Sequence, residues 1–355
     1  MASHQPPLRI ANVMLGRGLG GLEQALLDHN DALMLTGHDV LAVIHPDAAI
    51  RPAVEARDAP WHGIVHLGGW DMVAALRLRR LFQRFRPDIC LAHGNRAMSL
   101  LRLARAAPVI AVLPNYKMKC RDVASAFYPT QSLRHYAEGQ GVAPSSLHHI
   151  PSMVRVPPAW RPRRTWQTPT IGAMGRFVAK KGFDLLIDAL GRLHRQGLRF
   201  RAVLAGDGDE RAALEQQAQA SGLCDVLTFP GWVTDRQAFF DGIDVFCLPS
   251  HHEPFGIVLL EAMAQGMPIV ATASEGPAEI LHDGIDGDLV PKGDAVLLAR
   301  ALQRAIADPA RGARLGEAAW RCALETYDLP RVAQRIDRAV RDVVAASRAL
   351  AEASG

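Results

Sequence analysis

Residues 248–263 read LPSHHEPFGIVLLEAM, and this stretch decides how the rest of the chain is interpreted. The apolar run at residues 245–248 that leads into it predicts a buried strand, which a proline and a serine then end. A second proline and a glycine bracket a tight turn, and residues 257–264 continue as an apolar helix. The stretch therefore predicts a strand, a turn and a helix in immediate succession.

Two glutamates stand at fixed places around this predicted helix. Pro254 suits its first position, because the N–H that proline lacks would be unpaired there. Glu253 is then expected at the mouth of the helix, where backbone N–H groups favour a bound anion, and Glu261 two turns inside it. Glu253 could be a simple cap and Glu261 a solvated residue. An unpaired carboxylate is costly to bury in an apolar helix, however, and this cost favours a functional role.

The stretch resembles the Glu-x7-Glu signature of retaining glycosyltransferases with a GT-B fold, most closely glycosyltransferase family 4. The resemblance implies that Glu253 contacts the donor sugar and that Glu261 hydrogen-bonds the ribose of the nucleotide. It also places Pro254, Phe255 and Gly256 in the donor site. The matching segments are residues 249–250, 253–256, 261–264, 266–272 and 276–280.

Composition limits the protein classes that need to be considered. The chain has 355 residues, 49% of them hydrophobic, which is enough for two domains with sizeable cores. The net charge of +4 is a mild excess that suits an anionic donor and an anionic membrane surface. No basic stripe coincides with a nucleic-acid-binding motif, so we expect no nucleic-acid partner.

Cysteine usage and hydropathy indicate the compartment. The five cysteines are scattered, without a C-x-x-C pair, which is typical of reduced thiols in the cytosol. The first residues carry no signal-peptide core, and no apolar run is long enough to span a bilayer. We expect a cytoplasmic protein that associates peripherally with the inner membrane.

Apolar runs alternate with helical segments along the whole chain, and a helix is predicted from Leu22 to about Leu35. Such alternation predicts parallel sheets covered on both faces. A segment rich in Pro, Arg and Trp at residues 157–169 interrupts it and is interpreted as a linker. The predicted strands are residues 8–15, 39–44, 64–67, 89–92 and 109–113, and then residues 170–174, 201–205, 226–229, 245–248 and 268–272.

The predicted fold is α/β of the GT-B type, with two Rossmann-like, doubly wound domains facing a central cleft in which ligands bind. Residues 1–156 would form the acceptor-side domain and residues 165–329 the nucleotide-sugar donor domain. The tail, residues 329–349, is predicted as a helix. In GT-B enzymes the last helix commonly returns to the first domain, so residues 330–350 are expected to complete that domain.

A glycine-rich loop, residues 16–21, follows the first predicted strand. Its spacing fits the dinucleotide fingerprint G-x-G-x-x-G. Gly20 and Gly21 also open a Gly-Gly-x-Glu sequence that resembles the family motif lying against donor phosphates or acceptor. A purely structural turn is the third interpretation. The second domain favours the transferase, because a nicotinamide enzyme has no need of Glu253 and Glu261 at their spacing.

Residues 175–183 resemble the family's Gly-Arg…Lys-Gly motif, in which an arginine and a lysine neutralise the donor diphosphate. Arg176 and Lys181 match these positions, whereas Lys180 is expected to face solvent. The alternative is a solvated basic loop. Fixed cations stabilise the charge that develops on a leaving diphosphate, and the sequence has no Asp-x-Asp motif. We therefore expect no metal and no cofactor besides the UDP- or GDP-linked donor.

Further candidates are assigned by resemblance alone. Gly206, Gly231 and Val233 match positions that line the nucleotide-base pocket, although all three could be ordinary turn residues. Neither base nor sugar is specified by such positions, since backbone groups do much of the reading.

His93 resembles a catalytic family position that faces the cleft, with a core or capping histidine as the alternative. A second histidine is expected after the next strand, but Pro114 stands there. Asn115 or Tyr116 could replace it, which leaves the acceptor-side residue open. His62 and His66 flank a short strand and are not expected to bind metal.

Five arginines lie on a predicted helix, together with apolar residues on its other face. The helix is either an ordinary amphipathic helix with a solvated basic face or an electrostatic dock for anionic lipid headgroups. The arginines are Arg77, Arg79, Arg80, Arg84 and Arg86.

The combined motifs predict a retaining glycosyltransferase that moves a hexosyl group from a nucleotide sugar to a hydroxyl of a glycan or lipid-linked acceptor, of the cell-envelope polysaccharide or lipopolysaccharide type. A nucleotide-sugar epimerase of the same fold is the first alternative. A non-catalytic nucleotide-sugar-binding protein is the second. The sequence leaves the sugar, the acceptor and the oligomeric state open.

Overall fold

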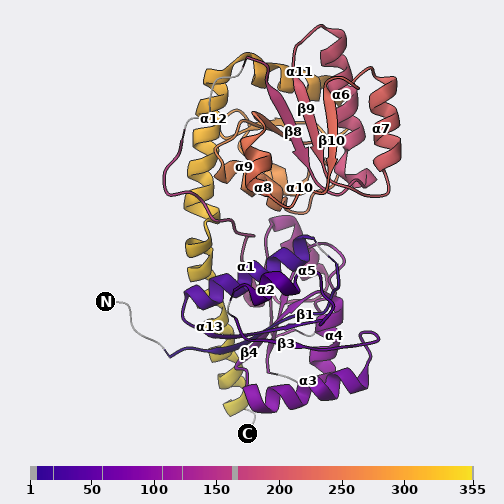
Figure 1. Cartoon of the computed structure of the whole chain (residues 1–355). Coiled ribbons are helices and arrows are strands. Elements are labelled where there is room, and N and C mark those ends of the chain that lie inside the picture. Colours follow the sequence, from indigo (N-terminus) through magenta and orange to yellow (C-terminus); the bar gives the residue numbers. More distant parts are fainter. Residues whose placement is uncertain are drawn as a thin grey trace. The chain divides into compact units, whose positions relative to one another are not determined.

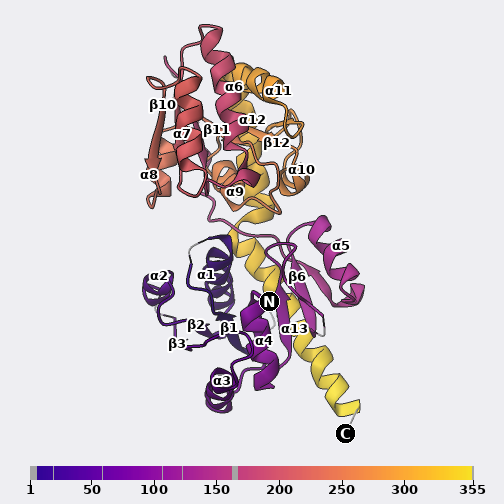
Figure 2. The same cartoon turned by 90° about the vertical axis from the view of Figure 1, so that its right-hand side faces the viewer.

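The computed structural model describes residues 6–18, 20–57, 59–105, 107–121, 123–161 and 167–353. The chain forms two compact units, shown in Figures 1 and 2. Unit 1 consists of the described residues up to Met153 together with those from Leu329 onward, and unit 2 runs from Val154 to Asp328. In the described part, no helix is both long and apolar enough to cross a membrane.

Unit 1 contains a parallel sheet of order β3-β2-β1-β4-β5-β6-β7. Almost every residue of its central strands is buried, because helices cover both faces. The strands are β1 (Arg9–Met14), β2 (Asp39–Ile44), β3 (Trp61–Gly63), β4 (Ile89–His93), β5 (Val109–Val112), β6 (Ser125–Tyr128) and β7 (Leu147–His149). The helices are α1 (Gly21–Leu35), α2 (Arg51–Glu55), α3 (Met72–Phe85), α4 (Asn95–Ala104), α5 (Gln131–Gly139) and α13 (Leu329–Ala353).

Alternation along β1 divides its side chains between the two faces of this sheet. Ala11 and Val13 pack in one cluster with residues of α3 and α4. Ile10 packs on the opposite face with residues of α1 and α13. The last helix of the chain is therefore a core element of unit 1.

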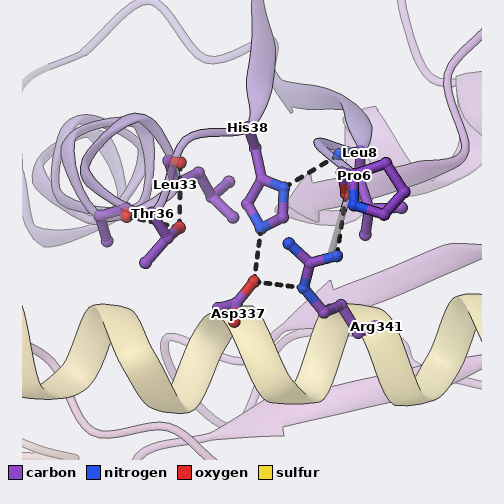
Figure 3. A network of polar contacts seen from close by, with 8 residues as sticks. Pro6, Leu8, Leu33, Thr36, His38, Asp337 and Arg341 are labelled. Atoms are coloured by element: carbon purple, nitrogen blue, oxygen red, sulfur yellow. Dashed lines mark hydrogen bonds and ion pairs between the residues drawn. The ribbon is translucent and has the colours of Figure 1, made fainter. Parts of the chain in front are cut away.

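Polar contacts fix α13 against the turn between α1 and β2 (Figure 3). Leu8 N–H donates to His38 Nδ1 (3.1 Å), so the ring proton is on Nε2, which donates to Asp337 Oδ1 (2.9 Å). Arg341 Nε donates to the same oxygen (2.7 Å). Burial, with a contribution from the Arg341 charge, lowers the pKa of His38 and keeps the ring neutral. The C-terminal helix is thus anchored by specific hydrogen bonds as well as by apolar packing.

Unit 2 contains a parallel sheet of order β10-β9-β8-β11-β12-β13. One face packs on α6, α7 and α11, and the other on α8, α9 and α12. The strands are β8 (Thr170–Met174), β9 (Arg201–Ala205), β10 (Leu227–Gly231), β11 (Val245–Leu248), β12 (Ile269–Thr272) and β13 (Asp288–Val290). The helices are α6 (Phe183–Arg195), α7 (Arg211–Ala220), α8 (Arg236–Asp241), α9 (Ile257–Ala264), α10 (Glu275–Ile280), α11 (Ala295–Ala307) and α12 (Pro309–Cys322).

Most predicted strands form within two residues of their expected bounds, but the strand at residues 64–67 is wrong. The edge strand is β3, and the Ile64 N–H bond to Ile44 O (2.9 Å) continues its pairing by one more residue. The chain then leaves the sheet, and Leu67 N–H donates to Asp71 Oδ2 (2.9 Å) at the start of α3. Leu67 is 98% exposed, so this apolar run is not a buried strand.

The predicted linker at residues 157–169 packs within unit 2 over its described part, and residues 162–166 lie outside the described residues. Trp320 Nε1 donates to Pro157 O (3.0 Å). The chain passes between the units at Met153–Val154 and again at Asp328–Leu329. The boundary therefore lies before the Pro-rich segment.

Each sheet has one point where the strand order reverses, between β1 and β4 in unit 1 and between β8 and β11 in unit 2. In open α/β sheets, ligands bind outside the carboxyl ends of the strands at such a switch point. The segments that follow these four strands are accordingly the first places to look for a site.

Candidate functional site

The switch point of unit 2 brings together two of the predicted catalytic residues. Lys181 follows β8 in a short 3-10 turn, and Glu253 lies in the loop that follows β11. Lys181 Nζ and Glu253 Oε2 form an ion pair, and their side chains are only 18% and 9% exposed. Ser250 Oγ donates to the same carboxylate oxygen (3.4 Å). A cation and a carboxylate from separate segments thus meet at the edge where ligands bind in this class of sheet.

A second glutamate, Glu275 at the start of α10, holds the backbone around Glu253. Glu253 N–H donates to Glu275 Oε2 (3.1 Å), and Gly276 N–H donates back to Glu253 O (2.7 Å). Glu275 Oε1 lies 3.1 Å from His252 Nδ1 and 3.6 Å from Lys292 Nζ. Sequence reasoning missed Glu275, although it stands three residues after the end of β12 and directly before residues 276–280, which match the family.

Two glycines allow the segments of the site to approach each other closely. Gly182 has a φ of +64°, and a Cβ there would lie 2.2 Å from Pro249 O. A Cβ on Gly276 would lie 2.0 Å from Phe255 O. Neither position can hold a side chain without displacing backbone. Close contact between these backbones fixes Lys181 opposite Glu253.

Glu261 lies one turn inside α9, rather than the predicted two, because the helix begins at Ile257 with Gly256 as its N-cap. The predicted first position, Pro254, is therefore in the preceding turn. Glu261 Oε1 forms an ion pair with Arg236, and its side chain is 16% exposed. Burial raises the pKa of Glu261 and the Arg236 charge opposes this shift. The other oxygen, Oε2, is buried without a hydrogen-bond partner among the described residues.

Arg236 is a second functional candidate that sequence reasoning missed. It is the first residue of α8, whose N-cap Asp235 accepts a hydrogen bond from Ala238 N–H (2.9 Å). No motif contains this arginine, and only the folded structure shows that it reaches Glu261. The pair leaves Oε2 of Glu261 buried and without a hydrogen-bond partner among the described residues.

Arg176 stands between two tightly anchored backbone positions. Gly175 N–H donates to Ala205 O (2.9 Å) and Phe177 N–H to Asp207 O (2.8 Å). The Arg176 side chain is exposed, and in the described part of the chain it has no hydrogen bond or ion pair to another residue. This guanidinium is therefore available to an anion.

The predicted base-pocket and turn residues lie in the same unit. Gly206 N–H donates to Gly231 O (2.8 Å), which joins the carboxyl ends of β9 and β10. Val233 is half-buried beyond Gly231. Phe255 is buried, with its ring 6.2 Å from that of Tyr327. These residues shape the edge of the sheet and present few polar side chains.

The structure places His93 in the core of unit 1, which corrects the prediction that it faces a ligand. The ring is 1% exposed, and its Nε2 donates to Asn12 Oδ1 (2.8 Å). His29 lies beside it, with ring centroids 5.2 Å apart. Burial lowers the pKa of His93 well below its usual value. A neutral, enclosed histidine of this kind supports the core alternative.

The remaining unit 1 candidates lie at strand ends. Gly20 is the N-cap of α1 and Gly21 its first residue, while Leu19 of the same loop lies outside the described residues. Pro114 follows β5. Asn115 Oδ1 accepts from Lys117 N–H (2.8 Å), and Tyr116 packs edge-on against Tyr136.

Comparison with known proteins identifies the chain's relatives. The family model described as "Glycosyl transferases group 1" matches residues 160–321. The lipopolysaccharide core biosynthesis glycosyltransferase LpsE of Rhizobium meliloti (strain 1021) is 32% identical over 313 residues, covering 84% of this chain and 89% of the relative. The phosphatidyl-myo-inositol mannosyltransferase of Mycobacterium leprae (strain TN) is 33% identical over 359 residues, with 92% and 94% covered.

A solved structure supports the fold. HepE of Anabaena, in complex with UDP-glucose, superposes with a TM-score of 0.81 at 20% identity, covering 94% of this chain and 100% of HepE. The predicted fold class, two Rossmann-like α/β domains of the GT-B type, is confirmed. The chain belongs to the glycosyl transferases group 1 family.

Proposed function

We propose that this protein is a retaining glycosyltransferase that moves a sugar from a UDP- or GDP-linked donor to a hydroxyl of a glycan or lipid-linked acceptor of the cell envelope. The observation that carries the proposal is the Lys181–Glu253 pair at the switch point of unit 2. The Arg176 guanidinium, which follows the same strand as Lys181 and has no bonding partner among the described residues, adds to it. Relatives named for lipopolysaccharide core synthesis and for phosphatidylinositol mannosylation support the acceptor class. HepE, which was solved with UDP-glucose, supports the donor class.

Each residue of the unit 2 site has a chemical task in this proposal. Arg176 and Lys181 neutralise the donor diphosphate, Arg176 as a rigid fork and Lys181 as a mobile point charge. Glu253 then contacts the sugar, and the Glu261 carboxylate accepts a hydrogen bond from the ribose. All four side chains come from one unit, which favours residues 165–329 as the donor domain and leaves residues 1–156 for the acceptor.

The proposed reaction breaks the bond between the anomeric carbon and the phosphate oxygen and forms one to the acceptor oxygen on the same face. The acceptor proton passes to the departing phosphate. Fixed cations stabilise the negative charge that develops on this phosphate, so we expect transfer to continue in EDTA. Complete loss of transfer that Mn²⁺ or Mg²⁺ restores would contradict that expectation.

A thermal-shift screen against UDP-, GDP- and ADP-sugars tests the donor, because a ligand that binds only the folded state raises its stability. Incubation of labelled donor with a crude lipid fraction then tests transfer. Retention is read from the anomeric configuration of the product by NMR. A glycoside with retained configuration supports the proposal. Free sugar without glycoside would indicate the epimerase, and binding without turnover would indicate the non-catalytic protein.

Lys181→Ala and Glu261→Ala should each weaken nucleotide binding about ten- to a hundredfold, because a charge-assisted hydrogen bond contributes roughly 1.5–3 kcal/mol. Calorimetry with the nucleoside diphosphate found in the screen measures the effect. Lys180→Ala, in the exposed neighbouring residue, is the matched control. Unchanged affinity in both site variants would remove the site assignment.

We also propose that the enzyme works on the cytoplasmic face of the inner membrane, held there by α3 and the loop before it. Leu67 and Trp70 are 98% and 83% exposed, which is unusual for side chains of their size. Along one stripe of α3, exposed apolar residues are followed by exposed arginines. The stripe consists of Val73, Leu76, Arg77, Arg80 and Arg84.

Such a surface suits a lipid interface, because Trp and Leu enter the headgroup region while arginines attract anionic lipids by about 1 kcal/mol each. Flotation with anionic and with neutral vesicles, at low and high salt, tests it. Trp70→Ser and the triple Arg77, Arg80 and Arg84→Ser variant should float less than wild type. Trp232→Ser, in an exposed tryptophan of unit 2, is the control. If the wild type floats equally with both lipids, or does not float at all, the exposed face of α3 is only a solvated helix surface.

A further inference from the structure

A cluster of basic side chains lies at the carboxyl ends of β1–β4 in unit 1, outside the proposed donor site. Arg17 follows β1, His45 follows β2 directly, His66 follows β3, and Arg96 is the second residue of α4, which follows β4. These strands are neighbours in the order β3-β2-β1-β4, so their carboxyl ends share one edge of the sheet. The cluster therefore spans the switch point of unit 1, where a ligand is expected.

Short contacts connect all four side chains. Arg17 Nη2 lies 3.0 Å from His45 Nε2, and the rings of His45 and His66 meet edge-on with centroids 5.3 Å apart. His66 Nε2 donates to Leu15 O (2.9 Å), and Arg96 Nη1 reaches the same carbonyl (3.4 Å). Burial is the largest cause that lowers the pKa of His45, and the positive charges of Arg17 and Arg96 lower it further.

The positive charges of this cluster are not balanced within it. Among the residues that the structure describes, neither guanidinium forms an ion pair with a carboxylate. Asp47 is exposed and lies 3.8 Å from His45 Nδ1. The Glu23 carboxylate faces the glycine loop, since a Cβ on Gly16 would lie 3.1 Å from its Oε1, and it bonds to neither arginine.

Hydrogen-bond donors also outnumber acceptors around His45. Arg17 Nη2 approaches Nε2, and Asp47 N–H points at Nδ1 (3.0 Å). A neutral imidazole offers one lone pair, so one of these donors lacks an acceptor. At His66, in contrast, an acceptor lacks a donor. Its Nε2 carries the proton, and its buried Nδ1 lone pair has no partner in the described part.

We propose that the switch point of unit 1 binds an anionic group of the acceptor, a phosphate or a carboxylate, through Arg17 and Arg96. An oxyanion would accept from both guanidiniums and relieve the excess of donors at His45. The free lone pair of His66 would accept from a sugar hydroxyl beside the anionic group. This inference rests on the proposed transferase function, and it narrows the acceptor to one that carries an acidic group.

The donor diphosphate is the competing source of negative charge, but unit 2 supplies its own cations for it, Arg176 and Lys181. The test must therefore separate acceptor from donor. Full-length protein is saturated with the nucleoside diphosphate found in the screen. Glucose 6-phosphate, glucuronate and glucose are then titrated against it and followed by ligand-observed NMR.

We expect one or both charged sugars to bind at least about tenfold more tightly than glucose. Arg17→Gln and Arg96→Gln should each weaken that binding about tenfold, the order of a lost charge-assisted hydrogen bond. Arg79→Gln, in an exposed arginine of α3, is the matched control and should change nothing. Thermal melting of each variant checks that it is folded.

Equal binding of glucose and the charged sugars, or unchanged binding in both variants, would overturn the inference. So would variants that lose nucleoside diphosphate affinity while keeping sugar phosphate affinity, because the cluster would then serve the donor. Nucleotide binding by the wild type is measured in the same series. If nucleotide binding fails, the proposed function fails, while titration of the charged sugars alone still reports on the cluster.

Discussion

Replacing Lys181 with methionine should destabilise unit 2 strongly, because it leaves a carboxylate enclosed without its cation. Glu253 is 9% exposed, and its remaining side-chain hydrogen bond comes from Ser250 Oγ at 3.4 Å. Its backbone is held in place on both sides by α10, so the carboxylate cannot simply turn to solvent. Methionine keeps the length and the apolar stem of lysine and removes only the charge.

The expected loss follows from the burial of both partners. Removing one member of a buried ion pair costs about 3–5 kcal/mol. Lys181 is 18% exposed and a serine hydroxyl remains, which places the loss near the lower end, at about 3 kcal/mol. For a unit of this size, that corresponds to a fall in melting temperature of about 6–12 °C. The double variant Lys181→Met, Glu253→Gln removes both charges and should recover most of this loss.

Differential scanning calorimetry of wild type, both single variants and the double variant measures the coupling. Activity must be lost in all three variants, including the double variant whose stability recovers, because stability and transfer depend on the pair for different reasons. Lys180→Met is the control for loss of a neighbouring positive charge. The reasoning would be refuted if Lys181→Met had the melting temperature of the wild type. It would also be refuted if the double variant melted at a temperature as low as that of Lys181→Met.

Three other perturbations have expected outcomes. Arg236→Gln leaves the Glu261 carboxylate without its cation and should lower the free energy of unfolding by about 1–2 kcal/mol, a value discounted because Arg236 is 44% exposed. The same variant should bind nucleotide more weakly in calorimetry, and unchanged affinity would show that Arg236 does not position Glu261. Burial lowers the pKa of His29 to about 4. The neutral ring then contributes stability above about pH 6.5, up to about 3 kcal/mol, that is lost as the pH falls towards 4. Urea unfolding of His29→Phe should therefore show a shallower acid limb than wild type, and parallel curves would exclude this origin. Gly182→Ala should lower the free energy of unfolding by more than about 1 kcal/mol and reduce transfer. Gly197 also has a positive φ (+77°) but lies in open space, so Gly197→Ala should lose only the stability that backbone strain removes. Equal losses of stability in the two variants would refute the steric argument.

The sequence predicts most strands well and brings Lys181 and Glu253 to one edge of the unit 2 sheet, because both results depend on local patterns. Buried parallel strands are continuous apolar runs, and Lys181 and Glu253 stand in motifs directly after two of them. Arg236 and Glu275 escape prediction because each opens a six-residue helix with no periodic signal. Their function depends on which neighbouring segment they meet, and tertiary packing alone decides that.

His93 shows a different limit of sequence reasoning. Its place at the end of β4 is predicted correctly, but its side-chain direction follows from the register of the strand. His93 pairs with Met14 of β1, and the alternation puts its ring on the same face as Asn12, beneath α1. A shift of one residue would have turned the ring to the opposite face. Strand position can be read from an apolar pattern more easily than register can.

The Lys181–Glu253 pair also has a consequence for how a donor binds. A ligand phosphate must compete with Glu253 for the same ammonium, and Glu253 must remain satisfied when its cation turns to the phosphate. In the proposed donor complex, a sugar hydroxyl that donates to Glu253 meets this need, so the diphosphate and the sugar of one donor would replace the ion pair together. We expect the intact pair to increase the affinity for a nucleotide sugar more than the affinity for a nucleoside diphosphate. Calorimetry of both ligands with the wild type and with the double variant measures the difference. In the proposed reaction, Glu253 would regain Lys181 once the sugar has been transferred, and the restored pair would favour release of the nucleoside diphosphate.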